Sequence, residues 1–166
     1  MLENKPDFAG VLAALTAADV RFVLVGGLAM VSHGSAHITQ DIDIAYSRAP
    51  ENLASLAKAL QVYRPRLRGL PTDLPFVLDA RTLSNAGNLT LETDVGAVDL
   101  LGDITSVSSF EDLWERAVEM DLGGGLSVRV ASLDDLIAMK RAADRPKDRL
   151  HLMELEALRR LVREEA

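Results

Sequence analysis

The chain has 166 residues, of which 48% are hydrophobic and 26% are charged, with a net charge of −7 and no cysteine. The excess of acidic over basic residues excludes a broad basic surface that would bind duplex nucleic acid. The lack of cysteine excludes disulfides and thiolate chemistry. Because there is no apolar leader and no run of about 18 apolar residues, we expect a cytoplasmic protein without a membrane partner. The length supports one buried core, so we expect a single domain over residues 1–166, with a core at about 20–131 and C-terminal helices at about 132–165.

Hydrophobic periodicity and turn residues divide the chain into helices and strands. Apolar residues three and four apart predict helices, whereas β-branched or alternating runs that end at turn residues predict strands. In chain order, the predicted elements are a helix at 6–18, a strand at 20–25, a helix at 28–32, a strand at 40–46, a helix at 50–60, strands at 89–93 and 97–101, a helix at 109–116, strands at 118–122 and 126–130, and helices at 132–143 and 147–165.

One segment without a predicted element is long enough to carry function. Residues 63–75 contain three prolines and are predicted to form a long loop. The loop carries Arg64, Arg66 and Arg68, which either keep it soluble or contact the phosphates of an acceptor. The sequence favours neither role.

Gly26 and Gly27 close the first predicted strand, and a helix follows them. Glycine lets a phosphate approach the backbone closely, and a helix N-terminus offers unpaired N–H groups with a partial positive charge. A glycine pair after a strand is on its own more typical of a tight turn. The phosphate-site hypothesis therefore depends on the acidic residues that follow.

Asp41 and Asp43 stand two residues apart in the second predicted strand, so both carboxylates project from one face while Ile42 and Ile44 point into the core. At about 4 Å and an effective dielectric constant of about 20, two carboxylates repel each other by about 4 kcal/mol. This repulsion favours a bound divalent cation such as Mg²⁺ over the alternative of a solvated strand edge. Asp99, in a later strand, is the candidate for a third ligand.

These segments together resemble the nucleotidyltransferases of the DNA polymerase β superfamily. The resemblance is carried by residues 25–34, 39–43, 98–101 and 132–140. It is strongest for small bacterial members related to the AbiE-type toxin nucleotidyltransferases, and looser for the aminoglycoside nucleotidyltransferases. The resemblance implies an α/β (α+β) fold, in which a nucleotidyltransferase-like mixed β-sheet has helices packed on one face and a C-terminal helical segment.

The resemblance also implies an activity. Such a protein transfers a nucleoside monophosphate from a nucleoside triphosphate such as ATP, with Mg²⁺ as the cofactor, to an RNA end, a protein or a small molecule. In a toxin–antitoxin system it would have a cognate antitoxin-like partner. A second hypothesis stays open, in which the chain is a catalytically impaired nucleotide-binding or regulatory module on the same scaffold.

Carried over position by position, the resemblance implies the roles of eight residues. Members of this group often have arginine where this chain has His37, and a neutral imidazole holds phosphate less firmly than a guanidinium group, which keeps the second hypothesis open. His33 and His151 are expected to lie on a helix surface or to pack, rather than to bind metal, and the roles of Arg145, Lys147 and Asp148 are left open. The implied catalytic and metal-binding residues are Asp41, Asp43 and Asp99, and the implied nucleotide-binding residues are Gly26, Gly27, His37, Thr39 and Lys140.

Overall fold

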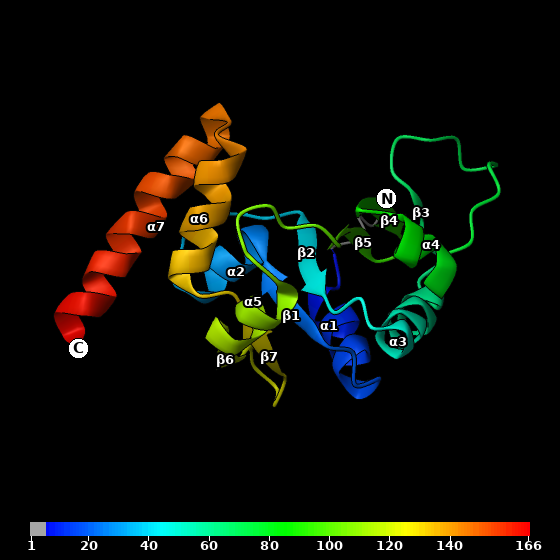
Figure 1. Ribbon diagram of the computed structural model, residues 1–166, viewed down its shortest axis with the longest axis horizontal. Coiled ribbons are helices and arrows are strands. Elements are labelled where there is room, and N and C mark those ends of the chain that lie inside the picture. Colours follow the sequence, from blue (N-terminus) through cyan, green and yellow to red (C-terminus); the bar gives the residue numbers. More distant parts are fainter. Residues whose placement is uncertain (1–5) are drawn as a thin grey trace.

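The computed structural model, described for residues 6–166, is built around a seven-stranded mixed sheet with helices packed against it (Figure 1). The strand order is β3-β4-β5-β2-β1-β7-β6. This arrangement confirms the mixed α/β class. The strands are β1 (Phe22–Val25), β2 (Asp41–Tyr46), β3 (Arg66–Leu67), β4 (Asn88–Thr93), β5 (Gly96–Leu101), β6 (Val118–Asp121) and β7 (Ser127–Val130), and the helices are α1 (Phe8–Ala17), α2 (Gly26–Ser32), α3 (Pro50–Gln61), α4 (Ala80–Asn85), α5 (Phe110–Arg116), α6 (Leu133–Ala143) and α7 (Pro146–Glu165).

The centre of the sheet sets the position of the acidic residues. Strand β2 pairs antiparallel with β1 and parallel with β5, with Val25 and Asp99 both opposite Asp43. Residues directly opposite each other in a sheet project to the same face. Asp43 and Asp99 therefore share one face, beside the point where β1 ends and α2 begins.

The opposite face of these strands forms the core. Ile42 and Ile44 of β2 are fully buried, as are Val98 and Leu100 of β5. This alternation of apolar and acidic side chains is the pattern that the sequence predicts. It fixes the register, because a shift of one residue would turn the carboxylates into the core.

Polar caps begin several helices where the sequence indicates. Asp7 accepts a hydrogen bond from the Gly10 amide at 2.9 Å before α1, and Ser132 accepts one from the Asp135 amide at 3.1 Å before α6. Each cap satisfies an N–H group that the helix itself cannot pair. Helix α7 then packs along α6, and α6 contacts α2.

Two elements differ from the prediction for residues 63–85. Strand β3 lies inside the segment predicted as a loop and is held by two residue pairs with β4, Arg66 with Glu92 and Leu67 with Leu91. Helix α4 lies outside the predicted elements, because it buries a single apolar side chain, that of Leu83, and so shows no apolar periodicity. Within residues 6–166, no helix has both the length and the apolar character needed to cross a membrane.

Candidate active site

A cavity of about 390 Å³ lies where β1 ends and β2 begins, and residues of α6 and α7 form its opposite wall. All eight residues that the sequence singles out for binding or catalysis line this cavity, although they come from four separate parts of the chain. They are Gly26, Gly27, His37, Thr39, Asp41, Asp43, Asp99 and Lys140.

Asp43 and Asp99 form the acidic centre of the cavity. The pKa of Asp43 is raised from 3.8 to about 7, chiefly by burial and then by the neighbouring carboxylates of Asp99 and Asp41, while Lys140 opposes the shift. A carboxyl group of this kind is costly to ionise without a cation nearby. The site therefore favours positive charge.

Arg68 supplies positive charge to these acids from outside the cavity lining. Its Nη2 donates to Asp99 Oδ1 at 2.8 Å and to the carbonyl of Leu91 at 2.9 Å, and its Nη1 lies 4.0 Å from Asp41 Oδ2. The buried Nε of Arg68 has no hydrogen-bond partner and lies 4.0 Å from Glu92 Oε1. The guanidinium group thus bridges two of the three candidate ligands.

The chemistry of the acidic residues fits a divalent cation. Hard cations such as Mg²⁺ prefer carboxylate oxygens, and three carboxylates reach this face from two paired strands. Among residues 6–166, however, no three acidic or histidine side chains are arranged as a ready metal site. Because Arg68 engages Asp99, we expect metal binding to require release of that ion pair.

Replacing Arg68 by glutamine is expected to raise the affinity for Mg²⁺ about fivefold, because the competing cation is removed. The same change is expected to lower the melting temperature of the metal-free protein by about 2–4 °C, since a half-buried ion pair of this type contributes about 1 kcal/mol. Calorimetric titration and thermal unfolding measure the two effects. Arg141→Gln, which breaks the exposed pair with Glu156, is the matched control. Unchanged Mg²⁺ affinity in Arg68→Gln would show that Arg68 does not compete with the metal.

The glycine pair lets the backbone pass close to Asp43 and Thr39. Gly26 has a φ of +68°, and a Cβ atom there would overlap the carboxylate of Asp43. A Cβ atom on Gly27 would lie 2.9 Å from Thr39 Oγ1. Only glycine fits this turn while Asp43 and Thr39 keep their positions.

Hydrogen bonds fix the segment between α2 and β2. The hydroxyl group of Thr39 donates to the carbonyl of Asp41 at 3.1 Å, so Thr39 supports the strand that carries the acids. Ser35 donates to Glu154 of α7 at 2.8 Å and accepts from the amide of His37 at 3.0 Å. These contacts fasten the segment that carries His37 to α7.

Lys140 is positioned by a buried carboxylate. Its Nζ donates to Asp148 Oδ1 at 3.2 Å, and Asp148 Oδ2 accepts hydrogen bonds from the Arg145 side chain at 2.6 Å and from the Arg145 backbone at 3.1 Å. Burial alone would raise the pKa of Asp148, but the hydrogen bonds from Arg145 and Lys140 outweigh it and place the pKa well below its usual range. Asp148 is fully buried and ionised, and it holds two cations at the cavity wall.

Two histidines complete this wall. The rings of His37 and His151 pack edge to face, with centroids 4.6 Å apart. Burial lowers the pKa of His151, and the positive charge of Lys140 lowers it further. The ring of His151 thus packs against that of His37, and it does so at the wall of the cavity.

Among the contributions to the site that sequence reasoning did not find are those of Arg68, Asp148 and His151. Arg68 reaches the acids only because β3 pairs with β4, and the pattern gave no indication of that two-residue strand. Asp148 could have been suspected as the third residue of a helix that begins at Pro146, where an acid commonly caps the first turn. For His151, helical spacing alone does not show which neighbours the ring contacts.

The fold is that of the nucleotidyltransferases. The structure superposes on the lincosamide antibiotic adenylyltransferase LnuA with a TM-score of 0.61 and 14% identity, over 93% of this chain and 99% of LnuA. It superposes on ANT(2")-Ia, solved with adenylyl-2"-tobramycin, with a TM-score of 0.55 and 15% identity, over 95% of each chain. A candidate nucleotidyltransferase from Thermotoga maritima gives a TM-score of 0.53 and 18% identity, over 94% of this chain and 90% of that one.

The sequence places the chain in a family as well. Residues 10–162 match the family described as "Nucleotidyltransferase of unknown function (DUF6036)", and the chain belongs to that family. None of the curated protein sequences matches it significantly.

Proposed function

We propose that this protein is a Mg²⁺-dependent nucleotidyltransferase, which transfers a nucleoside monophosphate from a nucleoside triphosphate to an acceptor hydroxyl group and releases pyrophosphate. The observation that carries the proposal is the convergence of Asp41, Asp43 and Asp99 with the Gly26–Gly27 turn and Lys140 around one cavity. Membership of a nucleotidyltransferase family supports it. We treat residues 1–166 as one domain in this role, and the absence of cysteine is consistent with a reducing compartment such as the cytoplasm.

The proposed reaction uses the two sides of the cavity differently. Backbone N–H groups at Gly26 and Gly27, together with Lys140, bind the phosphates of the triphosphate. Mg²⁺ held by the three aspartates would neutralise charge on the reacting phosphate. The acceptor oxygen forms a bond to the α-phosphorus, the bond from that phosphorus to the bridging oxygen breaks, and the acceptor proton passes to Asp99.

Two kinds of acceptor are each supported by a different similarity. The resemblance of the motifs to AbiE-type toxins supports an RNA end or a protein, with an antitoxin-like partner. The similarity of the fold to LnuA and ANT(2")-Ia supports a small molecule with a free hydroxyl group. The same reaction suits each kind of acceptor, because only the hydroxyl group of the acceptor takes part in it.

Incubation with each of the four labelled ribonucleoside triphosphates and Mg²⁺ tests the proposal. We expect pyrophosphate release and labelled product in fractions that contain the acceptor, and loss of both when the metal is removed with a chelator. Calorimetry with the same triphosphates measures binding separately. Binding without pyrophosphate release in the presence of all cell fractions would favour the catalytically impaired module instead, and His37 in place of arginine is the feature that motivates that alternative.

A further inference from the structure

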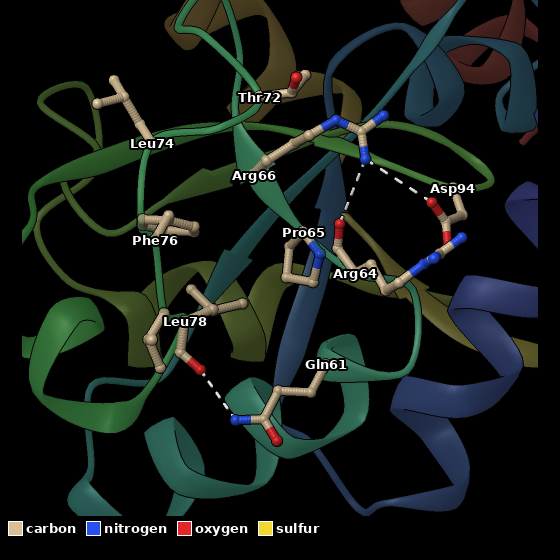
Figure 2. A pocket seen from close by; sticks show the side chains of 10 residues that line it. Gln61, Arg64, Pro65, Arg66, Thr72, Leu74, Phe76, Leu78 and Asp94 are labelled. Atoms are coloured by element: carbon tan, nitrogen blue, oxygen red, sulfur yellow. Dashed lines mark hydrogen bonds and ion pairs between the residues drawn. The ribbon is translucent and has the colours of Figure 1, made fainter.

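A second cavity, of about 580 Å³, lies between β3 and the segment 72–78 (Figure 2). We call it the β3 cavity. Arg64 and Arg66 of the β3 region and Asp94, which follows β4, line it on one side. Leu74, Phe76 and Leu78 line it on the other, and Gln61 of α3 holds their segment in place by donating to the carbonyl of Leu78 at 3.0 Å.

The β3 cavity adjoins the sheet face that carries the acids. Arg66 pairs with Glu92, Glu92 with Ala97, and Ala97 with Asp41, so these residues share one face. Three steps of about 4.8 Å place the Cα of Arg66 about 14 Å from that of Asp41. On the same face, Arg68 reaches across β4 to Asp99. A ligand of moderate length could therefore span from the cavity to the acids.

The geometry of the proposed reaction also places the acceptor on the β3 side of β2. The phosphate-binding groups belong to α2 and α6, which lie on one side of β2, whereas β3 and the loop after it lie on the other (Figure 1). In phosphoryl transfer, the attacking and leaving oxygens are roughly in line with the phosphorus. Because pyrophosphate would leave on the side of Lys140, the acceptor has to approach over β5, β4 and β3.

The charges of the β3 cavity favour an anion. Arg64 and Arg66 share one carboxylate, that of Asp94, and Arg66 Nη1 lies 3.7 Å from it and 3.5 Å from the carbonyl of Arg64. The guanidinium group of Arg66 is thus only weakly engaged, in a chain whose net charge is −7. The facing side chains of Leu74 and Phe76 are apolar, so the cavity combines a spare positive charge with an apolar wall.

We propose that the β3 cavity binds the acceptor, and that the acceptor carries a phosphate group next to an apolar or aromatic part. This proposal rests on the proposed function and names the acceptor's chemistry. Arg66 binds the phosphate, Phe76 packs against the apolar part, and the reacting hydroxyl group lies across β4, at Asp99.

Binding of 1-naphthyl phosphate, measured by its fluorescence, tests this pocket with a probe that has both features. Arg66→Gln is expected to weaken binding about tenfold, because a charge-assisted hydrogen bond is lost, while binding of neutral 1-naphthol stays the same. Phe76→Ser is expected to weaken binding of both compounds. Arg141→Gln, at an exposed ion pair elsewhere, is the control. Equal affinity of Arg66→Gln and the wild type for naphthyl phosphate would overturn the proposal.

Competition identifies the source of the phosphate group. Displacement of the probe by a ribotrinucleotide but not by O-phosphotyrosine supports an RNA end, and the reverse result supports a small aromatic phosphate. Displacement by neither would overturn the assignment of this cavity to the acceptor.

Paramagnetic relaxation relates the β3 cavity to the acids. With Mn²⁺ in place of Mg²⁺, the proton signals of bound naphthyl phosphate are expected to broaden in the wild type and not in Asp43→Asn. Bound Mn²⁺ without broadening would contradict the proposal, because the two sites would then be far apart. Failure of Mn²⁺ to bind at all would contradict the proposed function, and the comparison with Arg66→Gln would still decide whether this cavity binds phosphate.

Discussion

Replacing Asp43 by asparagine is expected to reduce nucleotide transfer at least about a thousandfold. The change removes one charge from the proposed metal site at almost constant volume, and metal stabilisation of transferring phosphate contributes several kcal/mol to such reactions. Asp43 faces Asp99 across the β2–β5 pair, so no neighbouring acid can take its place without leaving its own strand position. Pyrophosphate release under saturating triphosphate and Mg²⁺ measures the effect.

The same substitution is expected to stabilise the metal-free protein at pH 8. The pKa of Asp43 is raised from 3.8 to about 7 in the folded state, first by burial and then by Asp99. The stability linked to its bound proton is therefore fully present below about pH 4 and is lost as the pH rises through 7. A pKa shift of about three units corresponds to at most about 4 kcal/mol of folding free energy. Solvent in the open cavity and the nearby cations reduce this contribution to about 1–2 kcal/mol.

Thermal unfolding at several pH values checks this prediction. With a chelator present, the melting temperature of Asp43→Asn should exceed that of the wild type by about 3–6 °C at pH 8 and by nothing near pH 4. Added Mg²⁺ should raise the melting temperature of the wild type alone. The control is Asp19→Asn, an exposed turn residue with φ of +54°, which asparagine tolerates. Retained transfer activity, or a variant less stable than the wild type at pH 8, would contradict the role given to Asp43.

Local patterns are enough to predict the acidic face of the sheet. Asp41 and Asp43 alternate with Ile42 and Ile44, and this alternation fixes both the strand and the face on which the carboxylates lie. The Gly26–Gly27 pair predicts the turn, and the backbone at Gly26 has the positive φ that glycine favours. For these residues, the local pattern and the tertiary structure agree.

The contacts that tune the site depend on pairing between distant segments. Arg68 reaches Asp99 only through a two-residue strand in a proline-rich stretch, which has no periodicity of its own. Lys140 and Arg145 meet at Asp148 because α6 and α7 pack together after a sharp turn at Asp144, whose φ is +46°. Such contacts depend on how helices and strands pack together. The sequence therefore shows which charged residues are present, but it does not show which of them contact each other.

Replacing Asp148 by alanine is expected to destabilise the protein by about 3 kcal/mol and to lower its melting temperature by about 6–12 °C. The carboxylate is fully buried, and its loss leaves Lys140, whose side chain is 16% exposed, without a counter-ion. Arg145 is 57% exposed and can turn to solvent, which limits the cost. The variant should also bind triphosphate more weakly, because Lys140 is no longer held at the cavity wall.

The pH dependence separates this electrostatic role from simple packing. The pKa of Asp148 is depressed in the folded state, so its contribution is fully present above about pH 4 and is lost as the pH falls below that value. The stability difference between the wild type and Asp148→Ala should therefore be constant from pH 5 to 8 and shrink in stronger acid. Asp144→Asn is the matched control, because it removes an exposed pair with Arg149 at a left-handed position that asparagine accepts, and its effect should stay within about 0.5 kcal/mol. If the stability difference between the wild type and Asp148→Ala stays unchanged in acid, Asp148 acts through its shape rather than its charge. The position of Lys140 would then need another cause.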